Sequence, residues 1–373
     1  MLHEALLQAA LRCEMPSLDD VRSFGEDCPD EFFRSVVEPL ADSFSVQGAA
    51  AYGQLMRAWI PAVPVVPPVI PALVDVVYVL SRVTLGADIK IVSPILDAMK
   101  RRFPSARIVF VSNGKSAELF EDIEHLRADY PRSGSIASRI DFAHALRERM
   151  EAENAIVVDP DSRISQLGLI PLCEQTRYFH FPSRTVGTET SNLSALVEAW
   201  LSSTFGATGT AYIAPKRIPI ELEGSCAAVN LGVGENESKR IGGDFETKLL
   251  NAIGSKYEMV FVDRGAGGDE ARRVTSAVNN SAISDRVHYW EGGFAGFASV
   301  IAQSNLYVGY DSGGQHAAAA AGVPLICVFA GAASERFRHR WSATGSAKTI
   351  QTVADGRSPD EVFDAVKQAL RLD

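Results

Sequence analysis

The sequence predicts an α/β fold in which two doubly wound, Rossmann-like domains face a cleft, preceded by a helical extension. Three observations predict this. Runs rich in β-branched residues alternate with helical segments in two separate series, glycine-containing turns follow several strands, and 373 residues exceed one typical core. Such alternation builds parallel sheets with helices on their faces.

The front of the chain, residues 1–59, is predicted to be helical. The first helix covers 4–11 and the fourth 49–59, and Ser17 with Asp20 forms a capping box for the second. The third helix carries one apolar face, made of Phe32, Phe33, Val36, Val37 and Leu40. We expect either a cap that packs on the main body or a module that docks a partner or mediates oligomerisation.

A proline-rich stretch follows these helices. The apolar run 60–80 contains five prolines, at positions 61, 64, 67, 68 and 71. Clustered prolines break helices, so we expect an extended linker and not a membrane span. The extension and this linker together make up residues 1–71.

The first predicted domain covers residues 72–206. Its strands are expected at 74–80, 107–111 and 155–158, and its helices at 89–103, 116–121, 136–152 and 192–205. The polar segment 161–190 is expected to form surface loops and a short helix. Residues 206–223 contain two prolines and are predicted to link the domains.

The second predicted domain covers residues 207–373. Its strands are expected from 227, at 257–262, near 287–290, from 305 and at 325–329, with helices at 244–253, 270–278, 294–303, 315–321 and 358–372. The final helix has acidic residues in its first turn, as the helix dipole favours.

Charge and cysteine content limit the function. The formal net charge is -10 and the five cysteines are scattered without a CxxC pair. This excludes general binding to nucleic acids or anionic membranes and predicts reduced, buried thiols and no zinc site. Because no signal peptide is apparent, we expect a cytoplasmic protein whose membrane contact is at most peripheral.

The turn Asp311-Ser312-Gly313-Gly314, between a buried strand and a helix, is the strongest site candidate. A helix that begins after such a turn presents free N–H groups that suit a phosphate. Asp311 would repel a diphosphate there, so it either caps the helix or faces sugar hydroxyls. His316, in the first helical turn, either donates to phosphate or sugar or is satisfied locally.

Two further strand-end loops carry charged candidates. The loop 232–240 ends in Lys239-Arg240, which could bind a diphosphate or lie on a solvated surface. The loop 263–270 ends in Asp269-Glu270, which could hold a ribose hydroxyl or only favour a helix N-terminus.

Asp88 is the catalytic candidate of the first domain. It ends the loop after the first strand and opens the next helix. A carboxylate at this edge could remove a proton from an acceptor hydroxyl as a general base. The alternative is an N-cap aspartate with no catalytic role.

Taken together, these segments resemble the heptosyltransferases, a family of GT-B glycosyltransferases. The matching segments are Gly86-Ala87-Asp88 with Pro94, KRRFPSARI, NLGVGENESKR, DRGAGGDEAR, DSGGQHAAAAAGVPLICVFAG and GAASERFRHRWSATG. They occur in the family's order across residues 74–372. The loop at Asp88 is one residue longer than the family's Gly-Asp.

The resemblance implies an inverting, metal-independent glycosyltransferase that needs no cofactor and uses a nucleoside-diphosphate sugar, with ADP-heptose as the leading donor. A bacterial glycan, a lipid-linked molecule or a protein would be the acceptor. It implies that Asp88 is the base, that Lys239 neutralises the diphosphate and that Asp269 or Glu270 holds the ribose. Asp311, Ser312, Gly313 and His316 would hold the diphosphate and sugar, and the final helix could cross back to the first domain. The altered Asp88 loop leaves a non-catalytic nucleotide-sugar sensor or partner subunit as the alternative, and a GT-B sugar-nucleotide epimerase as a third hypothesis.

Overall fold

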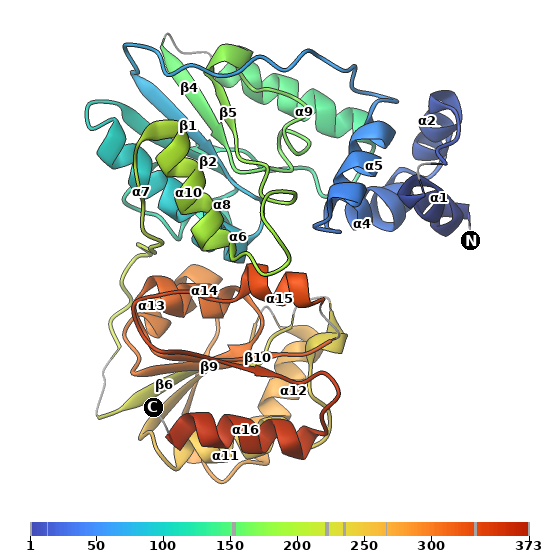
Figure 1. Cartoon of the computed structure of the whole chain (residues 1–373). Helices are drawn as coiled ribbons and strands as arrows, with labels where there is room; N and C mark the ends of the chain where they lie inside the picture. Colours follow the sequence, from blue (N-terminus) through green and yellow to red (C-terminus); the bar gives the residue numbers. More distant parts are fainter. Residues whose placement is uncertain are drawn as a thin grey trace.

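The computed structural model describes residues 2–12, 14–150, 154–220, 224–233, 236–265, 267–331 and 334–371. Two α/β domains lie one above the other, with the N-terminal helices beside the upper domain (Figure 1). Each domain contains one parallel sheet with helices packed on its faces. The predicted fold class is confirmed.

The extension folds into helices that share one core. Its elements are α1 Leu2–Leu11, α2 Leu18–Asp27, α3 Pro29–Phe32, a π-helical turn Phe33–Val37, α4 Glu38–Ala41 and α5 Val46–Met56. Ser17 accepts from the Asp20 N–H as predicted. The predicted apolar face is buried, and Ile136 of the first domain joins the same cluster. The extension is therefore packed onto the main body.

The widened turn in the third helix has a local cause. Pro39 follows it and has no N–H to donate. Its ring also crowds the carbonyl four residues earlier, so the preceding turn widens to a π-helical pattern. The chain leaves this helix at Ala41, which places the next residues over the cleft.

The first domain has the strand order β3-β2-β1-β4-β5, with all neighbours parallel. The strands are β1 Val76–Leu80, β2 Arg107–Ser112, β3 Glu124–Arg127, β4 Ala155–Asp159 and β5 Tyr178–His180. The helical elements are α6 Leu85–Ala87, a π-helical turn Asp88–Val92, α7 Ser93–Arg102, α8 Gly114–Ala117, α9 Ile136–Arg149, a 3-10 turn Gln175–Arg177 and α10 Leu193–Phe205.

The second domain has the strand order β11-β10-β9-β6-β7-β8, again parallel throughout. The strands are β6 Cys226–Asn230, β7 Met259–Asp263, β8 Val287–Trp290, β9 Leu306–Tyr310, β10 Leu325–Phe329 and β11 Thr349–Val353. The helices are α11 Phe245–Gly254, α12 Gly268–Asn279, α13 Phe294–Ile301, α14 Gly313–Ala320, α15 Glu335–Trp341 and α16 Pro359–Arg371, with 3-10 turns Glu237–Lys239 and Ser284–Arg286.

Both sheets reverse direction of winding at one point, between β1 and β4 in the first and between β6 and β9 in the second. Ligands of doubly wound sheets bind in the crevice at the carboxyl ends of such paired strands. The loops after these four strands are therefore the segments in which a site is expected.

Three strands and two helices escaped prediction: β3, β5, β11, the short α6 and α15. β3 (Glu124–Arg127) and β11 (Thr349–Val353) are edge strands with polar, partly exposed side chains, and β5 is also an edge strand, of three residues. Such strands lack the continuous apolar run of a strand buried on both faces. Edge position therefore explains why the three strands were missed.

The final helix does not cross back to the first domain. α16 packs against α11, β10 and β11 of its own domain, and Val362, Val366 and Leu370 enter that domain's core. Lys248 also pairs with Asp360 across α11 and α16 (2.7 Å). The predicted crossing is wrong because the apolar face of α16 is already covered (Figure 1).

The proline-rich segment is extended as predicted, with exposed Val63, Val65, Val66 and Val69. It runs beside the first domain, where the Val69 N–H donates to the Thr176 carbonyl (2.8 Å). Within the described ranges, no helix has the length and apolar character needed to cross a membrane.

Candidate active site

A cavity of about 400 Å³ lies where the loops of both sheets and the extension meet. The second domain contributes Lys239, Asp311, Ser312, Gly313, His316, Phe337 and Trp341. The first domain contributes Arg82, Thr84, Gly86, Ala87, Arg163 and Arg184, and the extension contributes Asp42 and Phe44. Because its walls come from the carboxyl ends of both sheets, we take this cavity as the candidate site.

Other cavities among the described residues are larger, but none of them has walls from the carboxyl ends of both sheets. One of about 510 Å³ lies beneath the linker and is lined mainly by apolar groups such as Trp59, Ile140 and Leu169. Its lining residues all belong to the extension, the linker and the first domain, so it does not lie between the two sheets. Its size alone does not make it the candidate site.

Lys239 and Asp311 form an ion pair on the second-domain side of the cavity. Lys239 Nζ lies 2.9 Å from Asp311 Oδ2, and the Gln315 side-chain amide donates to Asp311 Oδ1. The carboxylate therefore has both oxygens bonded, and its charge is balanced before any ligand arrives. This pairing removes the repulsion that Asp311 alone would exert on a diphosphate.

The turn after Asp311 leaves a helix N-terminus open to the cavity. Ser312 is the N-cap residue of α14, but its side chain caps no backbone N–H. The free N–H groups of the first turn are thus available to an anion. Gly314 does not line the cavity. It is buried, and a Cβ there would collide with the Tyr307 ring, so Gly314 is needed for packing.

Glycines allow the two domains to touch beside this turn. A Cβ at Gly86 would lie 3.1 Å from His316 Cδ2 and 3.4 Å from Gly313 Cα. The loop after β1 therefore approaches the start of α14 at van der Waals distance. This contact brings residues of the two predicted half-sites together.

His316 is buried in the cavity wall, with its ring 6.0 Å from that of Trp341. Burial, together with the charges of Lys90 and Lys239, holds the pKa of His316 well below its ordinary value. The imidazole is therefore neutral near pH 7 and can both donate and accept a hydrogen bond.

The adjacent acids Asp269 and Glu270 have different environments. The Asp269 side chain is 95% exposed and pairs with Arg272 of the next turn. Glu270 Oε1 faces the strand-end loops, since a Cβ at Gly232 would lie 2.8 Å from it and one at Gly265 would collide with it. Of the two predicted ribose ligands, Glu270 thus faces the strand ends and Asp269 faces solvent.

Arg240 lies outside the cavity that Lys239 lines. Its guanidinium pairs with Glu237 (3.1 Å) and approaches Glu246 (3.9 Å). Glu246 in turn pairs with Arg273. The structure therefore separates the two members of the predicted basic pair.

Asn230 and Asp263, which sequence reasoning missed, connect the ends of β6 and β7. The Asn230 side chain donates to Asp263 Oδ2 (2.9 Å), and the two residues accept from the N–H groups of Gly232 and Gly265. Burial is the main cause that raises the pKa of Asp263, and nearby Glu270 raises it further. Their position as the last residues of parallel strands was the available signal.

Asp88 is fully buried behind the cavity wall and does not line the cavity. It accepts from the Ser81 hydroxyl and from the Arg82 N–H, both at 2.7 Å. Burial raises its pKa to about 6. Thr84, not Asp88, occupies the N-cap position of this helix, so the N-cap alternative is wrong.

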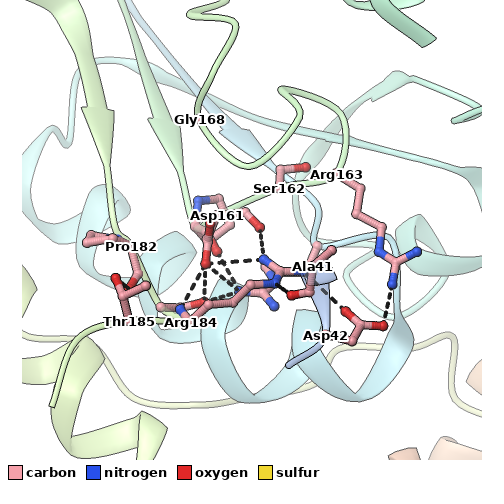
Figure 2. A network of polar contacts seen from close by, with 12 residues as sticks. Ala41, Asp42, Asp161, Ser162, Arg163, Gly168, Pro182, Arg184 and Thr185 are labelled. Carbon is pink, nitrogen blue, oxygen red and sulfur yellow. Dashed lines mark hydrogen bonds and ion pairs between the residues drawn. The ribbon is translucent and has the colours of Figure 1, made fainter. Parts of the chain in front are cut away.

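The first-domain wall contains a charged network that the sequence did not suggest (Figure 2). Arg184 donates to the Asp161 carbonyl (2.7 Å) and to the Ala41 carbonyl of the extension (2.6 Å). Arg163 pairs with Asp42 (2.6 Å). These residues lie on the loops after β4 and β5 or in the extension. The sequence of these segments contains no motif that predicts a site.

α15 joins the second domain to the first beside the cavity. Ser342, directly after it, accepts at its carbonyl from Lys90 (2.8 Å) and from Asn192 (2.9 Å). Arg340 donates to the Ser183 carbonyl (2.7 Å). Burial lowers the pKa of Lys90 to about 7. The cleft is therefore held in a closed arrangement by polar contacts.

In the described part of the chain, no group of three or more His, Cys, Asp or Glu side chains could hold a metal ion. This finding concerns the protein's own side chains alone. That the reaction needs no metal ion therefore stays a prediction.

Comparison with known proteins agrees with this geometry. Residues 292–365, from the loop before α13 into α16, match the family model of glycosyltransferase family 9 (heptosyltransferase). No curated protein matches the chain at the level of sequence.

Solved structures match over most of the chain. The glycosyl transferase family 9 protein of Veillonella parvula superposes with a TM-score of 0.60 at 15% identity, covering 80% of this chain and 98% of its own. E. coli heptosyltransferase WaaC with ADP-2-deoxy-2-fluoro heptose gives 0.58 at 16% identity, covering 80% and 99%. E. coli ADP-heptose lps heptosyltransferase II gives 0.52 at 16% identity, covering 79% and 98%. The chain is thus heptosyltransferase-like in fold and carries a glycosyltransferase family 9 segment, as its motifs predicted.

Proposed function

We propose that this protein is an inverting glycosyltransferase that moves a sugar from a nucleoside-diphosphate sugar to an acceptor hydroxyl. The observation that carries the proposal is the cavity at the paired strand ends of both sheets. There, Lys239, the open N-terminus of α14 and neutral His316 converge. Lys239 and the N-terminus of α14 suit a diphosphate, and His316 suits a sugar or phosphate oxygen.

On the donor side, the diphosphate would lie between Lys239 and the turn of Ser312 and Gly313, with Asp311 and His316 toward the sugar. The nucleoside would extend toward the ends of β6 and β7, where Glu270 faces Gly232 and Gly265. ADP-heptose is the leading donor, because one similar structure is a heptosyltransferase with ADP-2-deoxy-2-fluoro heptose and another is an ADP-heptose lps heptosyltransferase. The acceptor would be a bacterial glycan, a lipid-linked molecule or a protein.

In the reaction, the acceptor oxygen forms a bond to the anomeric carbon while the bond from that carbon to the diphosphate oxygen breaks. Attack from the face opposite the leaving group inverts the configuration. Lys239 and the α14 N–H groups stabilise the charge that develops on the diphosphate. No step in this proposal routes through a metal ion.

The acceptor proton passes to Asp88 in this proposal. Asp88 is bonded to Ser81 and Arg82 in the closed arrangement, so the loop after β1 has to move before the carboxylate meets the acceptor. The short contact between Gly86 and Gly313 couples that loop to the donor turn. Donor binding at the turn could therefore displace the loop.

The first experiment is a thermal-shift screen with ADP-, UDP-, GDP- and dTDP-sugars. A ligand that binds the native state raises the melting temperature, by an amount set by its concentration relative to Kd. We expect ADP-heptose to give the largest shift and transfer to persist in excess EDTA. No shift with any nucleotide would refute the donor site, and loss of transfer in EDTA would refute a metal-independent reaction.

A non-catalytic nucleotide-sugar sensor is the second candidate, and the burial of Asp88 favours it. The Asp88 carboxylate accepts two hydrogen bonds and has no exposed surface. In this position it stabilises the fold and does not reach an acceptor. Release of free nucleotide or sugar transfer by pure protein would eliminate the sensor. Tight donor binding without turnover across a broad acceptor panel would eliminate the transferase.

A further inference from the structure

Three arginines line the first-domain wall of the cleft cavity. Arg82 follows β1, Arg163 follows β4 and Arg184 follows β5. Arg82 and Arg184 are each 4% exposed. Guanidinium groups gathered in this way normally predict a site for a carboxylate or phosphate, because each can bind such a group through two parallel hydrogen bonds.

Three carboxylates cancel this charge, and two of them belong to the extension. Asp161 of the first domain lies 3.1 Å from Arg184 and 3.7 Å from Arg82. Arg163 is paired on one side with Glu38 (2.5 Å) and on the other with Asp42 (2.6 Å).

Asp42 occupies the position between two arginines that an anionic ligand would otherwise take. Its second oxygen lies 3.7 Å from Arg184, and Figure 2 shows its carboxylate between Arg163 and Arg184. Asp42 also lines the cavity directly. An anionic group that enters there meets the Asp42 carboxylate beside both guanidinium groups, and like charges at close range oppose binding.

We propose that Asp42, supported by Glu38, makes the acceptor side of the site select an uncharged, hydroxyl-bearing acceptor over an anionic one. The neighbouring wall suits such a ligand. Phe44, which is aromatic, and Thr84, which carries a hydroxyl, both line the same cavity. A sugar ring offers the matching pair of features, an apolar C–H face and a rim of hydroxyls. This inference rests on the proposed function, because only the transfer reaction makes the ligand of this wall an acceptor.

The preference for an uncharged group applies to the end of the acceptor that reacts in the cleft cavity. Asp42, Thr84 and Arg163 also border a second cavity of about 650 Å³ between the extension and the first domain. That cavity contains Arg34 and Arg132, which have no ion pair among the described residues. The remainder of a longer acceptor could occupy this outer cavity, where the charge is not cancelled.

The test compares the wild type with Asp42→Ala and Asp42→Asn, and uses Asp27→Ala as the matched control. Asp27 is exposed at the end of α2, does not line either cavity, and its replacement changes the net charge equally. Inorganic phosphate is titrated by calorimetry at fixed ionic strength, with and without saturating ADP. We expect both Asp42 variants to bind phosphate about tenfold more tightly than the wild type, the size of one close charge pair, and the gain to shrink in high salt.

A second readout uses methyl glucoside and methyl glucuronide, which share a ring and differ by a carboxylate. Ligand-observed NMR should show the preference moving toward the glucuronide by about tenfold in the Asp42 variants. Equal phosphate affinity in wild type and variants, or an equal gain in Asp27→Ala, would overturn the proposal. If circular dichroism shows that Asp42→Ala is unfolded, Asp42→Asn decides, since it keeps the shape and removes the charge.

These outcomes are separable from failure of the proposed function. Absence of any ADP binding would count against the donor site. The comparison between the wild type and the Asp42 variants without ADP would still report on the arginine wall, because the donor side is identical in all of them.

Discussion

Glu270 and Asp269 are neighbours in sequence whose roles the structure separates. Glu270→Gln should weaken nucleotide binding by about 1–3 kcal/mol, because a carboxylate bound to a ligand hydroxyl contributes that much. Asp269→Asn is the matched control, since that side chain is 95% exposed and pairs only with Arg272 among the described residues. Calorimetry with ADP measures both. Equal losses in the two variants would show that Glu270 has no specific contact.

Asp88 links stability, pH and turnover. Its folded-state pKa of about 6 exceeds the unfolded value of 3.8, because burial disfavours the charged form. The folded state therefore holds the proton more tightly, and the free energy of unfolding falls as pH rises from about 4 to about 6. Above that range, ionised Asp88 costs roughly 1–3 kcal/mol of stability.

Asp88→Asn should therefore raise the melting temperature at pH 8 and abolish most turnover, by about 10²–10⁴-fold if Asp88 is the base. The wild-type kcat/KM, which reports the free enzyme with Asp88 buried, should fall on the acid side with an apparent pKa near 6. Nucleotide binding should survive, because Asp88 does not line the cavity. Wild-type activity in this variant would remove Asp88 from the reaction.

At the scale of elements, Phe44 and α15 form the aromatic contact between the extension and the second domain. The Phe44 ring packs edge-on against Phe337 (6.2 Å) and Trp341 (5.8 Å), and its carbonyl accepts from Arg336 (2.7 Å). Phe44 is held at φ 48°, a left-handed conformation that a non-glycine residue adopts only at a cost. The surrounding contacts have to maintain it.

Phe44→Ala should loosen this contact by about 1–3 kcal/mol, the value of two aromatic pairs. Hydrogen exchange of the amides in Glu335–Trp341 should become faster, while donor affinity changes little. Val46→Ala is the control, because Val46 is 67% exposed and lies two residues away. Unchanged exchange in Phe44→Ala would mean that the Phe44 contact does not hold α15 in place.

The same elements show what the sequence could and could not predict. Strands buried on both faces, such as β1 and β10, were predicted within two residues because their apolar runs are continuous. The donor turn was predictable because a strand, a glycine turn and a helix are local in sequence. α15 and the arginine wall were not predictable. Arg163, Arg184 and Asp42 are far apart in the chain and meet only through tertiary packing.

At the scale of the whole molecule, the extension is part of the first domain's structure. Its buried helices share a core with Ile136 of α9, and the partly buried Ile140 and Leu167 pack against that core. Ala41 gives buried Arg184 a second carbonyl acceptor beside that of Asp161, and Asp42 and Glu38 pair with Arg163. Among the described residues, the polar and aromatic contacts between the extension and the second domain, which contains the predicted donor residues, are made by Phe44.

Deletion of residues 1–59 should therefore destabilise the first domain while the donor site survives. The loss includes both carboxylate partners of Arg163, about 1–3 kcal/mol, and newly exposed apolar surface on α9. Since 1 kcal/mol shifts the melting temperature of a domain this size by about 2–4 °C, we expect a fall of roughly 6–12 °C for about 3 kcal/mol.

The double variant Glu38→Gln/Asp42→Asn keeps the helices and removes only the charge of these two side chains, so its melting temperature should stay close to that of the wild type. A deletion variant with wild-type stability would show that the extension is a separate module. A double variant as unstable as the deletion variant would show that ion pairs, not packing, hold the extension in place.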